Sequence, residues 1–127
     1  MERVQNGTSI GETAKAAPTV FNNKFSYQLK ERKDAQVLIL LEDHLTTTNA
    51  NRFRTVVQEL VDKNKTRVIL NLRNVEYMDS TGLGALIGMS ETLRYRRGNL
   101  VLMNVGETVK KMLAITQMTE LFAIVGD

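Results

Sequence analysis

From residue 35 onward, short apolar runs alternate with longer segments whose apolar residues recur at helical spacing. The apolar runs cover residues 35–41, 67–72, 99–105 and 121–125, and the helical segments cover residues 47–63, 81–98 and 107–116. Consecutive strands joined through a helix pair in parallel, because a helix brings the chain back to the same end of the sheet. The alternation therefore predicts an α/β fold with a largely parallel sheet.

The N-terminal part of the chain follows a different pattern. Residues 1–19 show no sustained periodicity and contain the only proline, so we expect a flexible tail there. Phe25, Tyr27 and Leu29 then alternate with polar residues, which is typical of a half-buried strand. A charged turn at residues 31–34 would join this strand to the run at 35–41 as an antiparallel hairpin. With 127 residues, 43% of them hydrophobic, the chain is long enough for a single domain, which we place at residues 20–127.

The composition argues against several classes of function. The chain has no cysteine and one histidine, His44, so no His/Cys metal cluster is expected, and no motif calls for a cofactor. No stretch approaches the roughly 18 to 20 apolar residues of a membrane span, and the start lacks the apolar centre of a signal peptide, which favours a cytoplasmic protein without membrane contact. We interpret the arginines at the end of the second helical segment as complementing its dipole; they are Arg94, Arg96 and Arg97. They do not belong to an extended basic stripe, so nucleic acid is not expected as a partner.

The junction between the strand at 67–72 and the next helix places a serine at a helix start. Its local sequence is Asp79-Ser80-Thr81-Gly82. Three interpretations are open. Ser80 or Thr81 could cap the helix through its hydroxyl. Ser80 could be a nucleophile with His44 as its base, although the sequence lacks the G-x-S-x-G elbow. Ser80 could instead accept a phosphoryl group, which a helix N-terminus tolerates and which would block a binding surface by its charge.

Two glycines within the same helix need an explanation of their own. Gly84 and Gly88 are four residues apart and share one helix face. Each costs roughly 0.8 to 1 kcal/mol relative to alanine in a helix interior. Either the helix packs closely onto its own sheet at these positions, or a partner helix docks there.

The segment Met78-Asp79-Ser80-Thr81-Gly82-Leu83-Gly84 closely resembles the phosphorylation motif of bacterial anti-sigma factor antagonists, the STAS domain family. The order and spacing of the other apolar runs agree with that family over about residues 20–125. The resemblance implies a single STAS-like domain, with a mostly parallel sheet of four to five strands, an antiparallel N-terminal strand, and helices packed mainly on one face.

The resemblance also implies a mechanism of partner switching. The unphosphorylated domain would bind an anti-sigma factor that is also a serine kinase, and so release the sigma factor. That kinase, using its own ATP, would inactivate the domain by phosphorylating Ser80, and a serine phosphatase would reset it. The antagonist itself would not be an enzyme. The implied partner-binding residues are His44, Thr46, Thr47, Asp79, Ser80, Thr81, Gly82, Leu83 and Gly84, and Thr81 is a possible second acceptor.

Two departures from the family pattern accompany the resemblance. Many members have an acidic residue in the loop after the second strand, where this chain has His44-Leu45-Thr46, so a different partner is conceivable. Members also commonly have a helix after the last strand, whereas this sequence ends at Asp127, which would leave apolar surface for a partner or a second copy. The alternative function is a STAS scaffold in a sensory assembly that binds a regulatory partner other than an anti-sigma kinase.

Overall fold

Residues 25–126 are described here from a computed structural model, so the tail predicted at residues 1–19 lies outside the described residues. The strands are β1 (Tyr27–Arg32), β2 (Ala35–Leu40), β3 (His44–Leu45), β4 (Arg67–Asn71), β5 (Tyr77–Met78), β6 (Asn99–Met103) and β7 (Ala123–Val125). The helices are α2 (Ala50–Asp62), α3 (Ser80–Tyr95) and α4 (Glu107–Ile115), followed by a short 3₁₀ helix, η1 (Thr119–Leu121).

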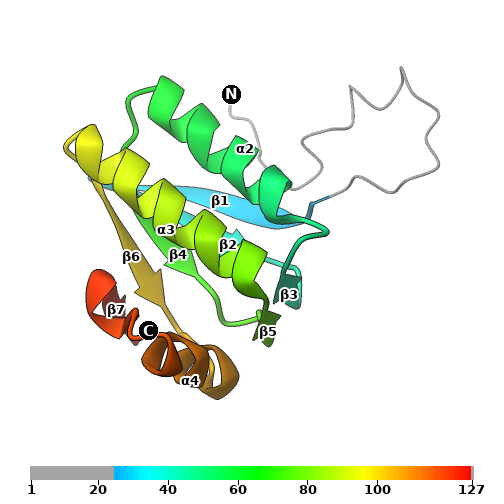
Figure 1. Ribbon diagram of the computed structural model, residues 1–127. Helices are drawn as coiled ribbons and strands as arrows, with labels where there is room; N and C mark the ends of the chain where they lie inside the picture. Colours follow the sequence, from blue (N-terminus) through cyan, green and yellow to red (C-terminus); the bar gives the residue numbers. More distant parts are fainter. Residues whose placement is uncertain (1–24, 127) are drawn as a thin grey trace, which may run out of the picture.

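The main sheet has five strands in the order β1-β2-β4-β6-β7. β1 pairs with β2 in the antiparallel sense, and the remaining neighbours are parallel. The parallel strands are added one after another in a single direction, and right-handed crossovers then place every connecting helix on the same side. Figure 1 shows α2 and α3 side by side over this face of the sheet, and α4 apart from them, near β5 and η1. The predicted α/β fold, with its antiparallel N-terminal strand and one-sided helices, is confirmed.

The hydrophobic core lies between this sheet face and the two long helices. Alternate residues of the central strands are almost fully buried there, namely Leu38, Leu40, Val68, Leu70, Leu100 and Leu102. From α2, the residues at helical spacing that meet them are Phe53, Val56, Val57, Leu60 and Val61. The period of two in the strands and 3.6 in the helices thus brings both apolar sets to one layer.

Several predicted ends of elements were wrong. The turn expected at residues 31–34 is shorter, because β1 continues through Arg32, which pairs with Ala35. Helix α3 ends at Tyr95 rather than at Gly98, and Arg97 is the residue that adopts a positive φ, of 67°. Gly98 serves a different purpose: a Cβ atom there would lie 1.9 Å from the carbonyl oxygen of Thr66. It is therefore the close approach of two chain segments that requires this glycine.

A second, two-stranded sheet was not predicted. β3 and β5 pair in parallel, with His44 opposite Tyr77 and Leu45 opposite Met78. Strands of two residues are too short for a pattern of alternation to reveal them. They hold the two loops of the candidate site together. Among the described residues, no helix has the length and apolar character that crossing a membrane would require.

Candidate functional site

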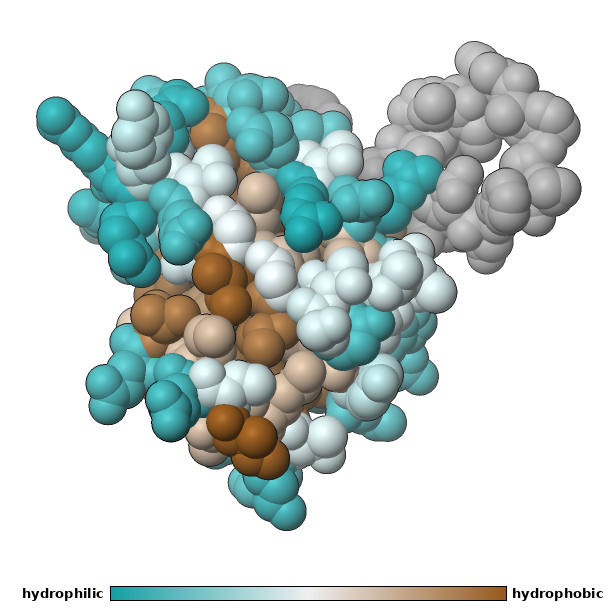
Figure 2. All heavy atoms as spheres, viewed as in Figure 1, coloured by the Kyte–Doolittle hydropathy of each residue, from teal (hydrophilic) through white to brown (hydrophobic). Residues whose placement is uncertain are grey.

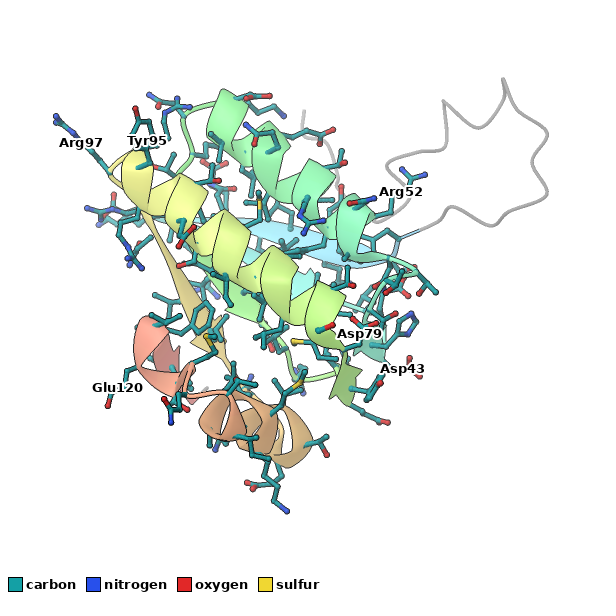
Figure 3. The ribbon with its side chains drawn as sticks, viewed as in Figure 1. Asp43, Arg52, Asp79, Tyr95, Arg97 and Glu120 are labelled. Carbon is teal, nitrogen blue, oxygen red and sulfur yellow. The ribbon has the colours of Figure 1, made fainter. Side chains whose placement is uncertain are left out.

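The candidate site lies where β3 and β5 end and α3 begins. The loop after β3 contributes Thr46 and Thr47, and the loop after β5 contributes Asp79 and Ser80. Since β3 and β5 are parallel and adjacent, their carboxyl ends deliver both loops to the same place. In Figure 3, Asp79 lies at the start of α3 and Asp43 lies near it, at the end of the molecule opposite Arg97.

Asp79 joins the two loops. Its Oδ1 accepts a hydrogen bond of 2.9 Å from the backbone N–H of Gly82, which makes it the N-cap of α3. Its Oδ2 accepts hydrogen bonds of 3.0 Å from both the N–H and the hydroxyl of Thr47. The cap is therefore Asp79, so the first of the three interpretations, a cap by the hydroxyl of Ser80 or Thr81, was wrong. A carboxylate fits this position because the helix N-terminus carries a partial positive charge.

These hydrogen bonds keep Asp79 ionised. The backbone N–H of Gly82, followed by that of Thr47, lowers the pKa of this carboxyl below its ordinary value of 3.8. Hydrogen bonds to the charged form favour it, and here they outweigh the opposing effect of partial desolvation. A fixed negative charge therefore stands directly beside Ser80.

The two neighbouring hydroxyl residues differ in their surroundings. Thr81 is half-buried, and its Oγ1 lies 3.1 Å from the hydroxyl of Thr47. Ser80 is exposed, and its hydroxyl has no hydrogen-bond partner among residues 25–126. Of the two, Ser80 is the hydroxyl that an incoming protein reaches without breaking a contact.

The loop after β3 is ordered by a residue that the sequence analysis missed. Asn49 is buried, accepts a hydrogen bond of 2.8 Å from the N–H of Thr46, and donates one of 3.0 Å to the carbonyl of His44. It occupies the N-cap position of α2, but its side chain makes no capping hydrogen bond to that helix. An asparagine just before a helical segment is the available signal, because its side chain commonly closes a turn of the backbone.

His44 does not lie free in the site. Its Nδ1 is 2.8 Å from Oδ1 of Asp43, and its Nε2 is 3.2 Å from the hydroxyl of Thr48. Both ring nitrogens are thus engaged, and neither contacts Ser80. Among residues 25–126, no group of His, Cys, Asp and Glu side chains has an arrangement that could hold a metal ion.

The three glycines of α3 play two different roles. A Cβ atom at Gly82 would lie 1.9 Å from the carbonyl oxygen of Leu45, so this glycine lets α3 start directly against β3. At Gly84 and Gly88 a Cβ atom would meet nothing within 4 Å. Of the two explanations left open for these glycines, close packing onto the domain's own sheet is therefore wrong.

Ser80, Gly84 and Gly88 are spaced by four residues and form one stripe along α3, which we call the glycine stripe. Gly84 is exposed and Gly88 half-buried, so backbone is accessible along this stripe. Figure 2 shows apolar surface next to it, between α3 and the C-terminal part of the chain. Ile87, Leu121 and Phe122 line a small hollow of about 30 Å³ there. Gly82 and Leu83 are buried, so they shape the site from beneath.

The fold and this site define a small α/β domain that offers a hydroxyl and an open helix face, with the features of a binding module. The chain belongs to the STAS domain family, whose model matches residues 26–126.

Relatives of the chain carry a consistent description. A protein of Listeria monocytogenes, named anti-sigma-B factor antagonist, is 27% identical over 99 residues, which cover 78% of this chain and 87% of that protein. The crystal structure of a candidate anti-sigma factor antagonist from Thermotoga maritima is 27% identical, with a TM-score of 0.69 over 78% of this chain and 85% of that one. The phosphorylated form of the Bacillus cell fate determinant SpoIIAA is 21% identical, with a TM-score of 0.61 over 78% of this chain and 90% of that one. At that identity the likeness to SpoIIAA shows the fold alone.

Proposed function

We propose that this protein is an anti-sigma factor antagonist, which binds an anti-sigma factor in the cytoplasm and thereby releases the sigma factor. The observation that carries the proposal is the glycine stripe, since Ser80 stands at one end of a helix face left bare by Gly84 and Gly88. Bare backbone allows a partner helix to approach closely, which offsets the cost of two glycines in a helix. The name of the Listeria relative supports this class of partner.

In this proposal, phosphorylation of Ser80 controls binding. The anti-sigma factor is a serine kinase: the Oγ of Ser80 attacks the γ-phosphorus of ATP held by that partner, ADP leaves, and the hydroxyl proton passes to a base of the kinase. A serine phosphatase later hydrolyses the phosphoester. Ser80 is a better acceptor than Thr81, because its hydroxyl is exposed and makes no contact that must be broken.

The physical effect of the phosphoryl group follows from its neighbours. It adds about −1.5 to −2 charges at neutral pH. Asp79, one residue away, is kept ionised by the N–H groups of Gly82 and Thr47, so the added charge adjoins an existing one. The phosphoryl group would repel an acidic partner surface, and against an apolar one it would be buried without a partner for its charge. The helix N-terminus within the domain tolerates the same charge. Binding is then lost and the fold is kept.

The protein would act by binding and not by catalysis. A hydrolase of the Ser80 and His44 type needs the imidazole to accept the serine proton. Here the ring nitrogens of His44 instead contact Asp43 and Thr48. The contact surface we propose consists of His44, Thr46, Thr47, Asp79, Ser80, Thr81 and Gly84, supported from below by Gly82 and Leu83.

The test compares Ser80→Asp and Ser80→Ala for binding to the ATP-binding anti-sigma factor from the same genome. We expect Ser80→Asp to weaken binding at least tenfold, which corresponds to about 1.4 kcal/mol, and Ser80→Ala to bind as wild type. Thr108→Asp is the matched control, because it adds the same charge to an exposed residue in the first turn of another helix, α4.

Phosphate on Ser80 after incubation with that kinase and ATP, located by fragment mass spectrometry and absent from Ser80→Ala, would complete the test. Undiminished binding of Ser80→Asp together with an unmodified Ser80 would overturn the switch. It would leave the alternative of a STAS scaffold with another partner.

A further inference from the structure

The face of the main sheet opposite the helices carries apolar residues that are separate from the hydrophobic core cluster. The pairing register places five apolar residues on this face, together with the polar Asn71; the five are Val37, Ile39, Ile69, Val101 and Met103. None of the five belongs to the core cluster or to the residues packed against it. Val37 is buried, and the other four, Ile39, Ile69, Val101 and Met103, are half-buried. We call these five residues the open sheet face.

The open sheet face leads into a hollow at the amino ends of β4 and β6. This hollow has a volume of about 480 Å³, and Ala35, Ile69 and Val101 contribute its apolar lining. Arg67 and Arg97 line the same hollow, with Asp34 as its one acidic residue. A recess of this kind accepts side chains that project from a docked segment.

The cations at this end of the sheet are not neutralised within the domain. A second hollow of about 270 Å³ shares Arg67 and Asp34 with the first. It adds Arg32, Lys33 and Lys65, with Glu31 as its further acidic residue. Among residues 25–126, ion pairs join only Lys65 to Glu31 and His44 to Asp43. Arg32, Arg67 and Arg97 therefore have no carboxylate partner in the part of the chain that the structure describes. We call these three residues the cationic rim.

We infer that the open sheet face and the cationic rim dock an amphipathic segment of a partner protein, whose apolar side chains enter the hollow and whose acidic residues meet the rim. Complementary charge is the basis for this choice of occupant. A second copy of this chain would bring an identical cationic rim. Residues 1–24 carry three basic and two acidic residues, which is no acidic excess. A flat anionic membrane would leave the hollow unfilled.

This surface is separate from the proposed switch. In Figure 3, Arg97 and Asp79 lie at opposite ends of α3. The inference does not rest on the proposed function, and it predicts that occupation of the open sheet face is independent of the charge at Ser80.

The test uses the full chain and two synthetic 18-residue helical peptides, one with leucines on one face and glutamates on the other, and one with lysines in place of the glutamates. Fluorescence anisotropy should show the glutamate peptide binding at least about tenfold more tightly than the lysine peptide. The double variant R67E/R97E should lose about tenfold in affinity for the glutamate peptide, and the equally charged K110E/K111E on exposed residues of α4 should not. Amide chemical shifts of the wild-type chain should change in β2, β4 and β6.

Further variants separate the remaining outcomes. Ile69→Thr keeps a β-branched residue in the strand and should also weaken peptide binding, and Ser80→Asp should leave it unchanged. Equal binding of the two peptides, or equal loss in both charge-reversed variants, would overturn the inference. So would binding of phosphatidylserine vesicles without binding of the glutamate peptide, or a dimer in sedimentation that R67E/R97E abolishes.

Discussion

Alanine substitutions at Gly82 and Gly84 should change stability in opposite directions, although the two positions lie two residues apart on the same helix. A Cβ atom at Gly82 would lie 1.9 Å from the oxygen and 2.6 Å from the carbon of the Leu45 carbonyl. Both are backbone atoms of β3, which is itself paired with β5. A Cβ atom at Gly84 would meet no other atom within 4 Å. Neither glycine has a positive φ, so alanine meets no backbone strain at either position.

The magnitudes follow from these distances. Real Cβ atoms essentially never come closer than 3.0 Å to such neighbours, so α3 must shift by about 1 Å in the Gly82→Ala variant. Overpacking of this kind costs about 1 to 3 kcal/mol and outweighs the helical preference for alanine. Gly84→Ala gains that preference with no clash, about 0.8 to 1 kcal/mol. A change of 1 kcal/mol in a domain of this size shifts Tm by roughly 4 °C.

The assay is urea denaturation with Tm as a second measure, followed by binding to the anti-sigma factor. Gly82→Ala should lower the free energy of unfolding and Gly84→Ala should raise it. Gly84→Ala should nevertheless weaken partner binding, because its methyl group covers the glycine stripe. If Gly84 had only a structural role, Gly84→Ala would not raise stability and weaken binding at the same time. A Gly84→Ala variant that is less stable than wild type, or a Gly82→Ala variant of unchanged stability, would refute the reasoning.

Three further predictions concern single contacts. Asp79→Asn should be less stable than wild type at neutral pH, and this difference in stability should shrink below about pH 4. The reason is that folding lowers the pKa of the Asp79 carboxyl, so its ionised form stabilises the fold above the unfolded pKa and this effect is lost as the group is protonated. Tm measured between about pH 2.5 and 7 checks the sign. Thr47→Val should lower the free energy of unfolding by at most about 1 kcal/mol, as measured by urea denaturation. It should leave intact the capping hydrogen bond from the N–H of Gly82 to Asp79, as read from the amide chemical shift of Gly82. Gly98→Ala should lower Tm, because its Cβ atom would meet the carbonyl of Thr66; an unchanged Tm would contradict this packing.

The fold was readable from the sequence because each long element has a strong period. The runs at 35–41 and 67–72 and the segment at 47–63 match β2, β4 and α2 to within about three residues at each end. β3 and β5 were not readable, since two residues cannot display a period. Their pairing depends on the main sheet and the two loops, which exist only after the chain has folded.

The candidate site was only partly readable for a related reason. The sequence placed a hydroxyl at the start of α3, but it did not show which of three neighbouring polar residues caps the helix. Asp79 takes that place because it can also accept two hydrogen bonds from Thr47, which is 32 residues away in the chain. The role of the glycines in α3 stayed open for the same reason. The spacing of Gly84 and Gly88 reveals a shared face, but not whether that face points toward the sheet or toward solvent.

The topology explains how one small domain would offer the two proposed surfaces independently. Because β2, β4, β6 and β7 are added in one direction with right-handed crossovers, the two long helices cover one face, and the apolar residues of the other face lie outside the core cluster. The carboxyl ends of the parallel strands face Ser80, and their amino ends carry Arg67 and Arg97. A phosphoryl group acts within about 8 to 10 Å at physiological salt, because screening removes its effect beyond that range. Charge added to Ser80 should therefore govern the partner on the glycine stripe and leave the open sheet face free to hold a second partner.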